Sequence, residues 1–142
     1  MRQALYGLIT ALLLLQAPAL ATGTTPHDVR RAIASGKPTL IQFGTSHCET
    51  CTKMKPTLEA VTREYAGRVN VLYVDVELEA ALGRRFQVQR LPTQIFFDGT
   101  GAERKRNTGT LDREDIAAIL SELETGKATP VVLSAADSDP SR

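Results

Sequence analysis

The sequence contains no tryptophan, and aromatic residues make up only 5% of its 142 residues. An aromatic platform on which nucleic-acid bases could stack is therefore not expected. The chain also lacks an excess of either charge, because 17 Lys and Arg residues stand against 16 Asp and Glu residues. Without a basic surface to neutralise phosphates, the composition indicates no nucleic-acid partner.

Cysteine is scarce as well, with two residues in the whole chain. This excludes a small scaffold held together by many disulfides. The hydrophobic share of 42% is enough to bury the core of one domain at this length. No inserted segment is long enough to form a dimerisation module, so we expect a monomer.

Residues 1–21 have the pattern of a secretory signal peptide. Arg2 supplies a positive charge, an apolar run of signal-peptide length follows, and small residues alternate up to Ala21. A retained membrane anchor is the alternative, but the run is short for a span and is interrupted by Gln16 and Pro18. We therefore expect export with cleavage after Ala21, which leaves both cysteines in a potentially oxidising compartment.

The rest of the chain divides into residues 22–126, which show helix and strand periodicity, and residues 127–142, which are rich in Ser, Asp, Ala and Pro. We predict one domain followed by a disordered tail. The expected helices cover residues 26–35, 48–66, 77–86 and 112–126, and the expected strands cover residues 39–43, 69–76, 93–97 and 103–107. This order predicts an α/β fold with a central mixed β-sheet flanked by helices and an extra N-terminal helix.

Three local patterns refine this prediction. Pro56 falls inside the second expected helix and should kink it, because proline removes a backbone donor. The run 69–76 is almost continuously apolar, which is typical of a strand buried on both faces. The turn-forming residues 98–101 predict a hairpin that leads into a polar edge strand.

The segment Cys48-Glu49-Thr50-Cys51 carries the predicted chemistry. Cys48 falls at a strand-to-helix turn, where free backbone N–H groups and the helix dipole stabilise a thiolate. A thiolate is the nucleophile of disulfide exchange, and the reaction needs neither an organic cofactor nor a metal. We predict that Cys48 attacks a disulfide and that Cys51, one helical turn further on, resolves the mixed disulfide.

Two cysteines at this spacing could also bind a metal ion or form a purely structural disulfide. A structural zinc site needs four ligands, and the only histidines, His27 and His47, are not paired at metal-site spacing. An inert structural disulfide would add little to the stability of the fold, because closing so short a loop removes little entropy from the unfolded chain. Binding of copper(I) by Cys48 and Cys51 is chemically feasible and stays open.

From about residue 25 to residue 124, the chain resembles the thioredoxin superfamily in the joint spacing of its motifs. The matching positions are Phe43, Cys48-x-x-Cys51, Pro56, Val74-Asp75-Val76, Leu91-Pro92-Thr93, Phe96-Phe97-Asp98-Gly99 and Gly109. The resemblance implies a thioredoxin fold. Together with the signal sequence, the leading helix resembles exported, thioredoxin-like proteins of bacterial envelopes, which implies a periplasmic location.

The same resemblance implies a substrate groove framed by Leu91 and Pro92, with the bond between them in the cis form and close to the cysteine pair. A cis bond there leaves the Leu91 backbone free to pair with an extended substrate segment. The implied activity is that of a protein-disulfide oxidoreductase. The preferred direction is reduction of envelope proteins, with recharging by a membrane-embedded thiol reductase.

Two alternatives remain. One is an oxidant that donates its disulfide, since a strongly stabilised Cys48 thiolate makes the disulfide easy to reduce. The other is a non-catalytic binding module that uses the groove to hold a partner protein or copper(I). A departure from the family pattern favours it: Gln42 stands where the family has a buried Asp, and Tyr73 replaces the usual partner Lys. Glutamine cannot take up a proton, so the route by which Cys51 loses its proton is open.

The residues around the first cysteine also depart from the family pattern. His47 stands where the family has Trp, and Glu49 and Thr50 replace Gly-Pro between the cysteines. We expect all three residues to tune the site. A protonated His47 lowers the pKa of Cys48, whereas the Glu49 carboxylate raises it.

Overall fold

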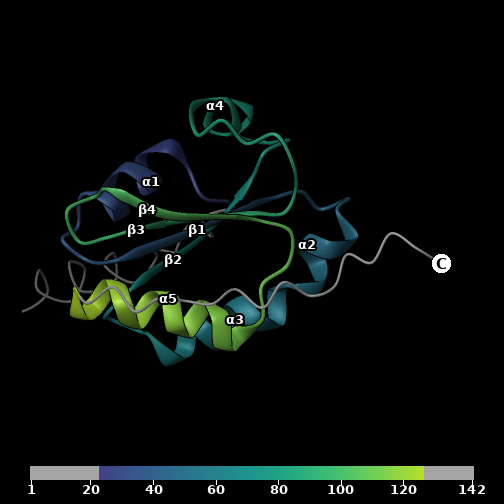
Figure 1. Cartoon of the computed structure of the whole chain (residues 1–142). Coiled ribbons are helices and arrows are strands. Elements are labelled where there is room, and N and C mark those ends of the chain that lie inside the picture. The colour runs from purple at the N-terminus through teal and green to yellow at the C-terminus, as the bar shows by residue number, and fades with distance from the viewer. Residues whose placement is uncertain (1–22, 127–142) are drawn as a thin grey trace, which may run out of the picture.

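In the computed structural model, which describes residues 23–126, a four-stranded sheet separates two layers of helices (Figure 1). The elements follow the chain as α1 (Pro26–Ile33), β1 (Thr39–Gly44), α2 (Glu49–Lys53), α3 (Lys55–Glu64), β2 (Asn70–Asp75), α4 (Ala80–Arg85), β3 (Thr93–Phe97), β4 (Glu103–Thr108) and α5 (Arg113–Thr125). The predicted order of helices and strands is confirmed, including the extra N-terminal helix.

The strand order in the sheet is β2-β1-β3-β4. Strand β1 runs parallel to β2 and antiparallel to β3, and β3 pairs antiparallel with β4. The sheet is therefore mixed, as expected from an early crossover helix and a closing hairpin. Every residue of β1 and β3 is buried, so these two strands form the centre of the molecule.

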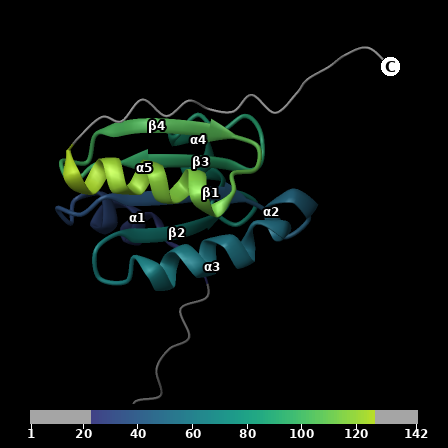
Figure 2. The same cartoon turned by 60° about the horizontal axis from the view of Figure 1, so that its bottom comes forward.

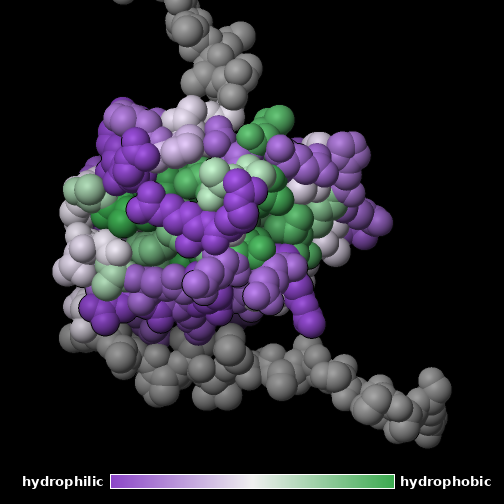
Figure 3. Space-filling view, turned by 90° about the horizontal axis from the view of Figure 1, so that it is seen from above, coloured by the Kyte–Doolittle hydropathy of each residue, from purple (hydrophilic) through white to green (hydrophobic). Residues whose placement is uncertain are grey.

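Each face of the sheet has its own apolar core. Leu40 and Phe96 point to the face covered by α3 and α5, and they pack with residues such as Ile119. Ile41 and Ile95 point to the opposite face, where α1 and α4 lie. Figure 2 shows α3 and α5 in front of the sheet, and Figure 3 looks onto the other face, where polar side chains surround apolar ones.

Sequence patterns at the helix ends fix where α1 and α5 begin. The Thr25 side chain accepts from the Asp28 backbone N–H, and the Asp28 carboxylate accepts from the Thr25 N–H, which is a capping box. Asp112 caps α5 through the Asp115 N–H. Gly126 ends α5 in the left-handed conformation, with φ of 65°.

The prediction that residues 69–76 form a strand buried on both faces is wrong in one respect. Strand β2 is present, but it lies at the edge of the sheet, and within it only Val74 is fully buried. Val71, Leu72 and Tyr73 are half-buried. An apolar run shows that a strand can be buried on both faces. Whether it is buried depends on its position in the sheet, and a strand at the edge is covered less than a central one.

The helix expected from residue 48 to residue 66 is also corrected. The chain forms two helices, α2 and α3, that meet at Met54. Pro56 lies in the first turn of α3, where its missing N–H is not needed. Proline therefore starts a new helix here rather than kinking a continuous one.

The predicted signal peptide (residues 1–21) and the predicted tail (residues 127–142) lie outside the described residues. Within residues 23–126, no helix is both long and apolar enough to cross a membrane.

The central position of β3 gives a test of the fold. We expect Ile95→Ala to lower the free energy of unfolding by about 2–5 kcal/mol, because Ile95 is fully buried and its loss leaves a cavity. The matched control is Leu78→Ala, since the Leu78 side chain is exposed and its loss should change stability by less than about 0.5 kcal/mol. Urea unfolding of the oxidised protein measures both. Equal losses in the two variants would contradict the described core.

Candidate active site

Cys48 and Cys51 lie where the chain leaves the buried strand β1 and enters α2. They are joined by a disulfide, with their Cα atoms 5.2 Å apart. Cys48 is the N-cap residue of α2 and is partly exposed, whereas Cys51 is fully buried. The two sulfurs thus differ in access: a substrate can approach Cys48, while Cys51 is reached only from within the site.

The surroundings of Cys48 favour a negatively charged sulfur. The Cys51 backbone N–H donates to Cys48 Sγ at 3.2 Å, and Thr50 Oγ1 lies 3.4 Å from the same sulfur. Both groups can donate to a thiolate when the disulfide is reduced. Donors aimed at an ionised sulfur lower the pKa of its thiol.

The two residues that flank Cys48, His47 and Glu49, each have a side-chain partner of their own. His47 Nδ1 lies 3.0 Å from Glu77 Oε2, and Glu49 Oε1 lies 2.7 Å from Lys53 Nζ. All four side chains are largely exposed, so each pair contributes little to stability. What the pairs do is hold the His47 ring on Glu77 and direct the Glu49 carboxylate along α2 to Lys53.

Glu77 was not predicted from the sequence. It follows β2 by two residues, and β2 is parallel to β1 with Gly44 opposite Asp75. The carboxyl ends of two adjacent parallel strands therefore bring Glu77 next to His47. The parallel pairing of the two strands was the only signal available, and an acidic residue after a strand is too common to single out.

Leu91 and Pro92 lie at the same end of the sheet as the cysteine pair. Thr93, the first residue of β3, is opposite Phe43, near the end of β1. The Leu91–Pro92 peptide bond is cis, the form that the resemblance implies. The Pro92 carbonyl accepts from the Gly109 N–H at 2.8 Å, which ties this segment to the end of β4.

A layer of neutral polar side chains lies beneath the site, on the α3/α5 face of the sheet. Gln94 Nε2 donates to Gln42 Oε1 at 3.2 Å and lies at the same distance from Met54 Sδ. Asn107 Nδ2 donates to Gln94 Oε1 at 2.7 Å. Gln42 Nε2 is buried without a hydrogen-bond partner. The position where the family has an ionisable carboxyl is therefore occupied by part of an amide network.

The described part of the chain shows no cluster of side chains suited to bind a metal ion. Within residues 23–126, no three His, Cys, Asp or Glu side chains gather closely enough to hold a metal ion. The His47 ring is hydrogen-bonded to Glu77.

A four-stranded mixed sheet between helices, with a Cys-x-x-Cys disulfide at a helix N-terminus and a cis-proline at the same end, defines a class: thioredoxin-fold domains with a redox-type cysteine pair. The comparison with known families agrees, because residues 25–124 match the model of the thioredoxin-like domain. The chain belongs to the thioredoxin-like domain family.

Individual relatives support this assignment. The chain is 37% identical over 99 residues to protein disulfide-isomerase erp38 of Neurospora crassa, which covers 68% of this chain and 27% of that protein. It is 37% identical over 93 residues to a thioredoxin of Mycolicibacterium smegmatis, covering 64% and 80% of the two chains. The crystal structure of chloroplastic thioredoxin z superposes with a TM-score of 0.66 at 28% identity, covering 72% of this chain and 93% of the other.

The chain spans only about a quarter of the length of the fungal disulfide isomerases that it matches. Most of the length of each of those relatives therefore lies outside the alignment with this chain.

The hydrogen bonds at Cys48 give a test of the site. We expect Thr50→Val to raise the pKa of the reduced Cys48 thiol by about half a unit, because one donor to the thiolate is lost. The pH dependence of the alkylation rate reports this pKa, since Cys51 is buried. Thr52→Val is the matched control, as the Thr52 hydroxyl donates to the Cys48 carbonyl oxygen and not to sulfur. Equal Cys48 pKa values in wild type and Thr50→Val would show that the Thr50 hydroxyl does not stabilise the thiolate.

Proposed function

We propose that this protein is an exported protein thiol–disulfide oxidoreductase that reduces disulfides of envelope proteins in a bacterial periplasm. The observation that carries the proposal is the Cys48–Cys51 disulfide at the start of α2, with one sulfur accessible and the other buried. Similarity to thioredoxins and disulfide isomerases supports exchange chemistry, and the signal-like sequence of residues 1–21 supports export.

The reduced pair acts in two steps. The Cys48 thiolate attacks one sulfur of a substrate disulfide, and the departing substrate thiolate takes up a proton. Cys51 then loses its proton and attacks Cys48 Sγ, which forms the Cys48–Cys51 bond and releases the second substrate thiolate. Two electrons pass from the cysteine pair to the substrate. A thiol reductase in the membrane restores the dithiol.

Leu91 and Pro92 position the substrate in this scheme. Leu91 comes just before β3, at the end of the sheet that carries the cysteine pair, where its backbone can pair with an extended substrate segment that adds as a short strand. Thr50, His47 and Glu49 tune the Cys48 thiolate through the contacts described above. The protein works as a monomer, and exchange itself draws on no cofactor.

The direction of electron flow is tested by the reduction potential of the Cys48–Cys51 pair. Equilibration of residues 22–142 with glutathione buffers should give a value near about −270 mV, as for thioredoxin. Insulin reduction should occur and should disappear in Cys48→Ser. A potential near about −120 mV would identify a disulfide donor instead. If no turnover depends on Cys48, then the protein is not a thiol–disulfide oxidoreductase, and the alternative of a non-catalytic binding module is favoured.

Export is tested by expression of the full chain in a bacterium with a periplasm. We expect the protein in the periplasmic fraction, with Thr22 as its first residue by mass spectrometry, because an Ala-x-Ala sequence precedes that position. Replacing both Ala19 and Ala21 by Leu should block cleavage, while Ala17→Leu, outside the cleavage positions, should not. An uncleaved protein in the cytoplasm would exclude the proposed location.

A further inference from the structure

The buried thiol of Cys51 has to lose a proton in the resolving step, and the Gln42 amide cannot take it up. The pairing of β1 and β2 places another residue close by. Gln42 lies opposite Tyr73, and Gly44 follows two residues later on the same face of β1. The side chains that line this part of the sheet are therefore Gln42 and Tyr73, below α2.

Gly44 shows how close the Tyr73 hydroxyl comes to Cys51. A Cβ atom at Gly44 would lie 2.8 Å from Tyr73 Oη and 3.1 Å from Cys51 Sγ. Both atoms thus border the same small space above Gly44. Because Gly44 has no side chain, no Cβ atom fills this space between the hydroxyl and the sulfur.

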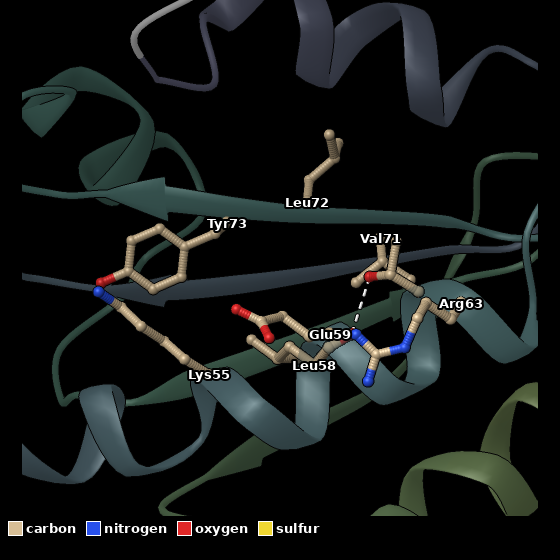
Figure 4. A pocket seen from close by; sticks show the side chains of 8 residues that line it. Lys55, Leu58, Glu59, Arg63, Val71, Leu72 and Tyr73 are labelled. Atoms are coloured by element: carbon tan, nitrogen blue, oxygen red, sulfur yellow. Dashed lines mark hydrogen bonds between the residues drawn. The ribbon is translucent and has the colours of Figure 1, made fainter.

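The other side of Tyr73 faces a groove. A cavity of about 490 Å³ runs between α3 and the exposed edge of β2, and Tyr73 lines it together with Lys55, Leu58 and Val71. In Figure 4, Lys55 extends from α3 toward the hydroxyl end of the Tyr73 ring. Among the side chains drawn there, no hydrogen bond holds that hydroxyl. Tyr73 therefore stands between the buried sulfur and a groove that opens to solvent.

The phenol keeps its proton at neutral pH. Burial raises the pKa of Tyr73, and the negative charges of Asp75 and Glu77 raise it further. A neutral phenol is a hydrogen-bond donor and not a base. Its contribution to the chemistry is consequently to stabilise a negative charge that forms beside it.

We propose that the Tyr73 hydroxyl donates a hydrogen bond to the Cys51 thiolate as it forms, and so takes over the support that an ionisable side chain beneath the site would give. The proposal rests on the exchange reaction assigned above to Cys48 and Cys51. The Cys51 proton passes to solvent through the groove, the sulfur lone pair forms the bond to Cys48 Sγ, and the substrate sulfur leaves as a thiolate. Tyr73 itself is neither oxidised nor deprotonated.

Other charged groups around Tyr73 bear on the pH dependence. Lys55 and Glu59 face the groove from α3, and Asp75 and Glu77 lie at the end of β2 and just beyond it. Strand β1 contributes only neutral neighbours, Gln42 and Gly44. These charges are the same in wild type and in a Tyr73→Phe variant, so a difference between the two proteins reports the hydroxyl.

The first measurement is the pKa of the Cys51 thiol in a Cys48→Ser background, followed through the chemical shift of its Cβ atom. We expect Tyr73→Phe to raise this pKa by about one unit, because a donor to a charged group is lost. The matched control is Tyr65→Phe, since the Tyr65 hydroxyl donates to the Ala117 carbonyl oxygen, outside the site. Tyr65→Phe should leave the Cys51 pKa unchanged.

The second measurement is the resolving step in otherwise wild-type protein. The reduced protein reacts with an aromatic disulfide reagent, whose first thiol is released by Cys48 and whose second is released by Cys51. Tyr73→Phe should slow the second release about threefold at neutral pH, because the loss of thiolate that one pKa unit causes is partly offset by the greater nucleophilicity of a more basic thiolate. It should leave the first release unchanged, and the deficit should close at alkaline pH. A purely structural role would lower stability without this pH dependence.

The outcomes separate this inference from the proposed function. If wild type releases no second thiol, then the exchange reaction fails and the inference fails with it. If wild type resolves the mixed disulfide and Tyr73→Phe matches it in both Cys51 pKa and rate, then only the role of Tyr73 is overturned. Tyr73→Phe removes a single oxygen atom, and a melting temperature equal to that of wild type is the check that the variant keeps its fold.

Discussion

Everything at the active site depends on the complete burial of β1 and β3. The pairing covers all of β3, from Thr39 opposite Phe97 to Phe43 opposite Thr93. Because both strands are covered on both faces, a shift of one residue would move every side chain to the opposite face and disrupt the packing of both cores. The fixed register places the loop after β1 and the segment before β3 at one end of the sheet. The cysteine pair and the cis-proline lie at the same end of the sheet for that reason.

The chemistry at this end is governed by neutral hydrogen bonds more than by buried charge. The Cys51 N–H and the Thr50 hydroxyl approach Cys48 Sγ, and an amide network of Gln42, Gln94 and Asn107 lies beneath. The side chains of His47 and Glu49, on either side of Cys48, are exposed and paired with Glu77 and Lys53. A buried unpaired charge would cost far more than an amide network that is nearly satisfied. The thiolates of this pair therefore depend on donors and on the start of α2.

Much of the fold could be predicted because it is encoded locally. The capping box at Thr25, the cap at Asp112 and the turn at residues 98–101 each act within a few residues, and the helices and the hairpin that they delimit lie close to where the sequence predicts them. The errors involve position in the sheet. The sequence predicts that β2 is buried on both faces, but this strand lies at an edge of the sheet. The sequence also predicts a kink at Pro56, but this residue lies in the first turn of α3. Neither outcome is decided by the residues nearest in sequence.

The sequence by itself determined where the candidate reacting atoms lie: the Cys-x-x-Cys spacing at a helix start places the two sulfurs one helical turn apart. It also determined the departures, with Gln42 and Tyr73 at unusual positions. Only the tertiary structure decided what those departures mean. The parallel pairing of β1 and β2 brings Glu77 to His47, thirty positions earlier in the sequence, and places the Tyr73 hydroxyl and Cys51 Sγ around the same space at Gly44. Only a packed sheet fixes which of these distant residues come close together.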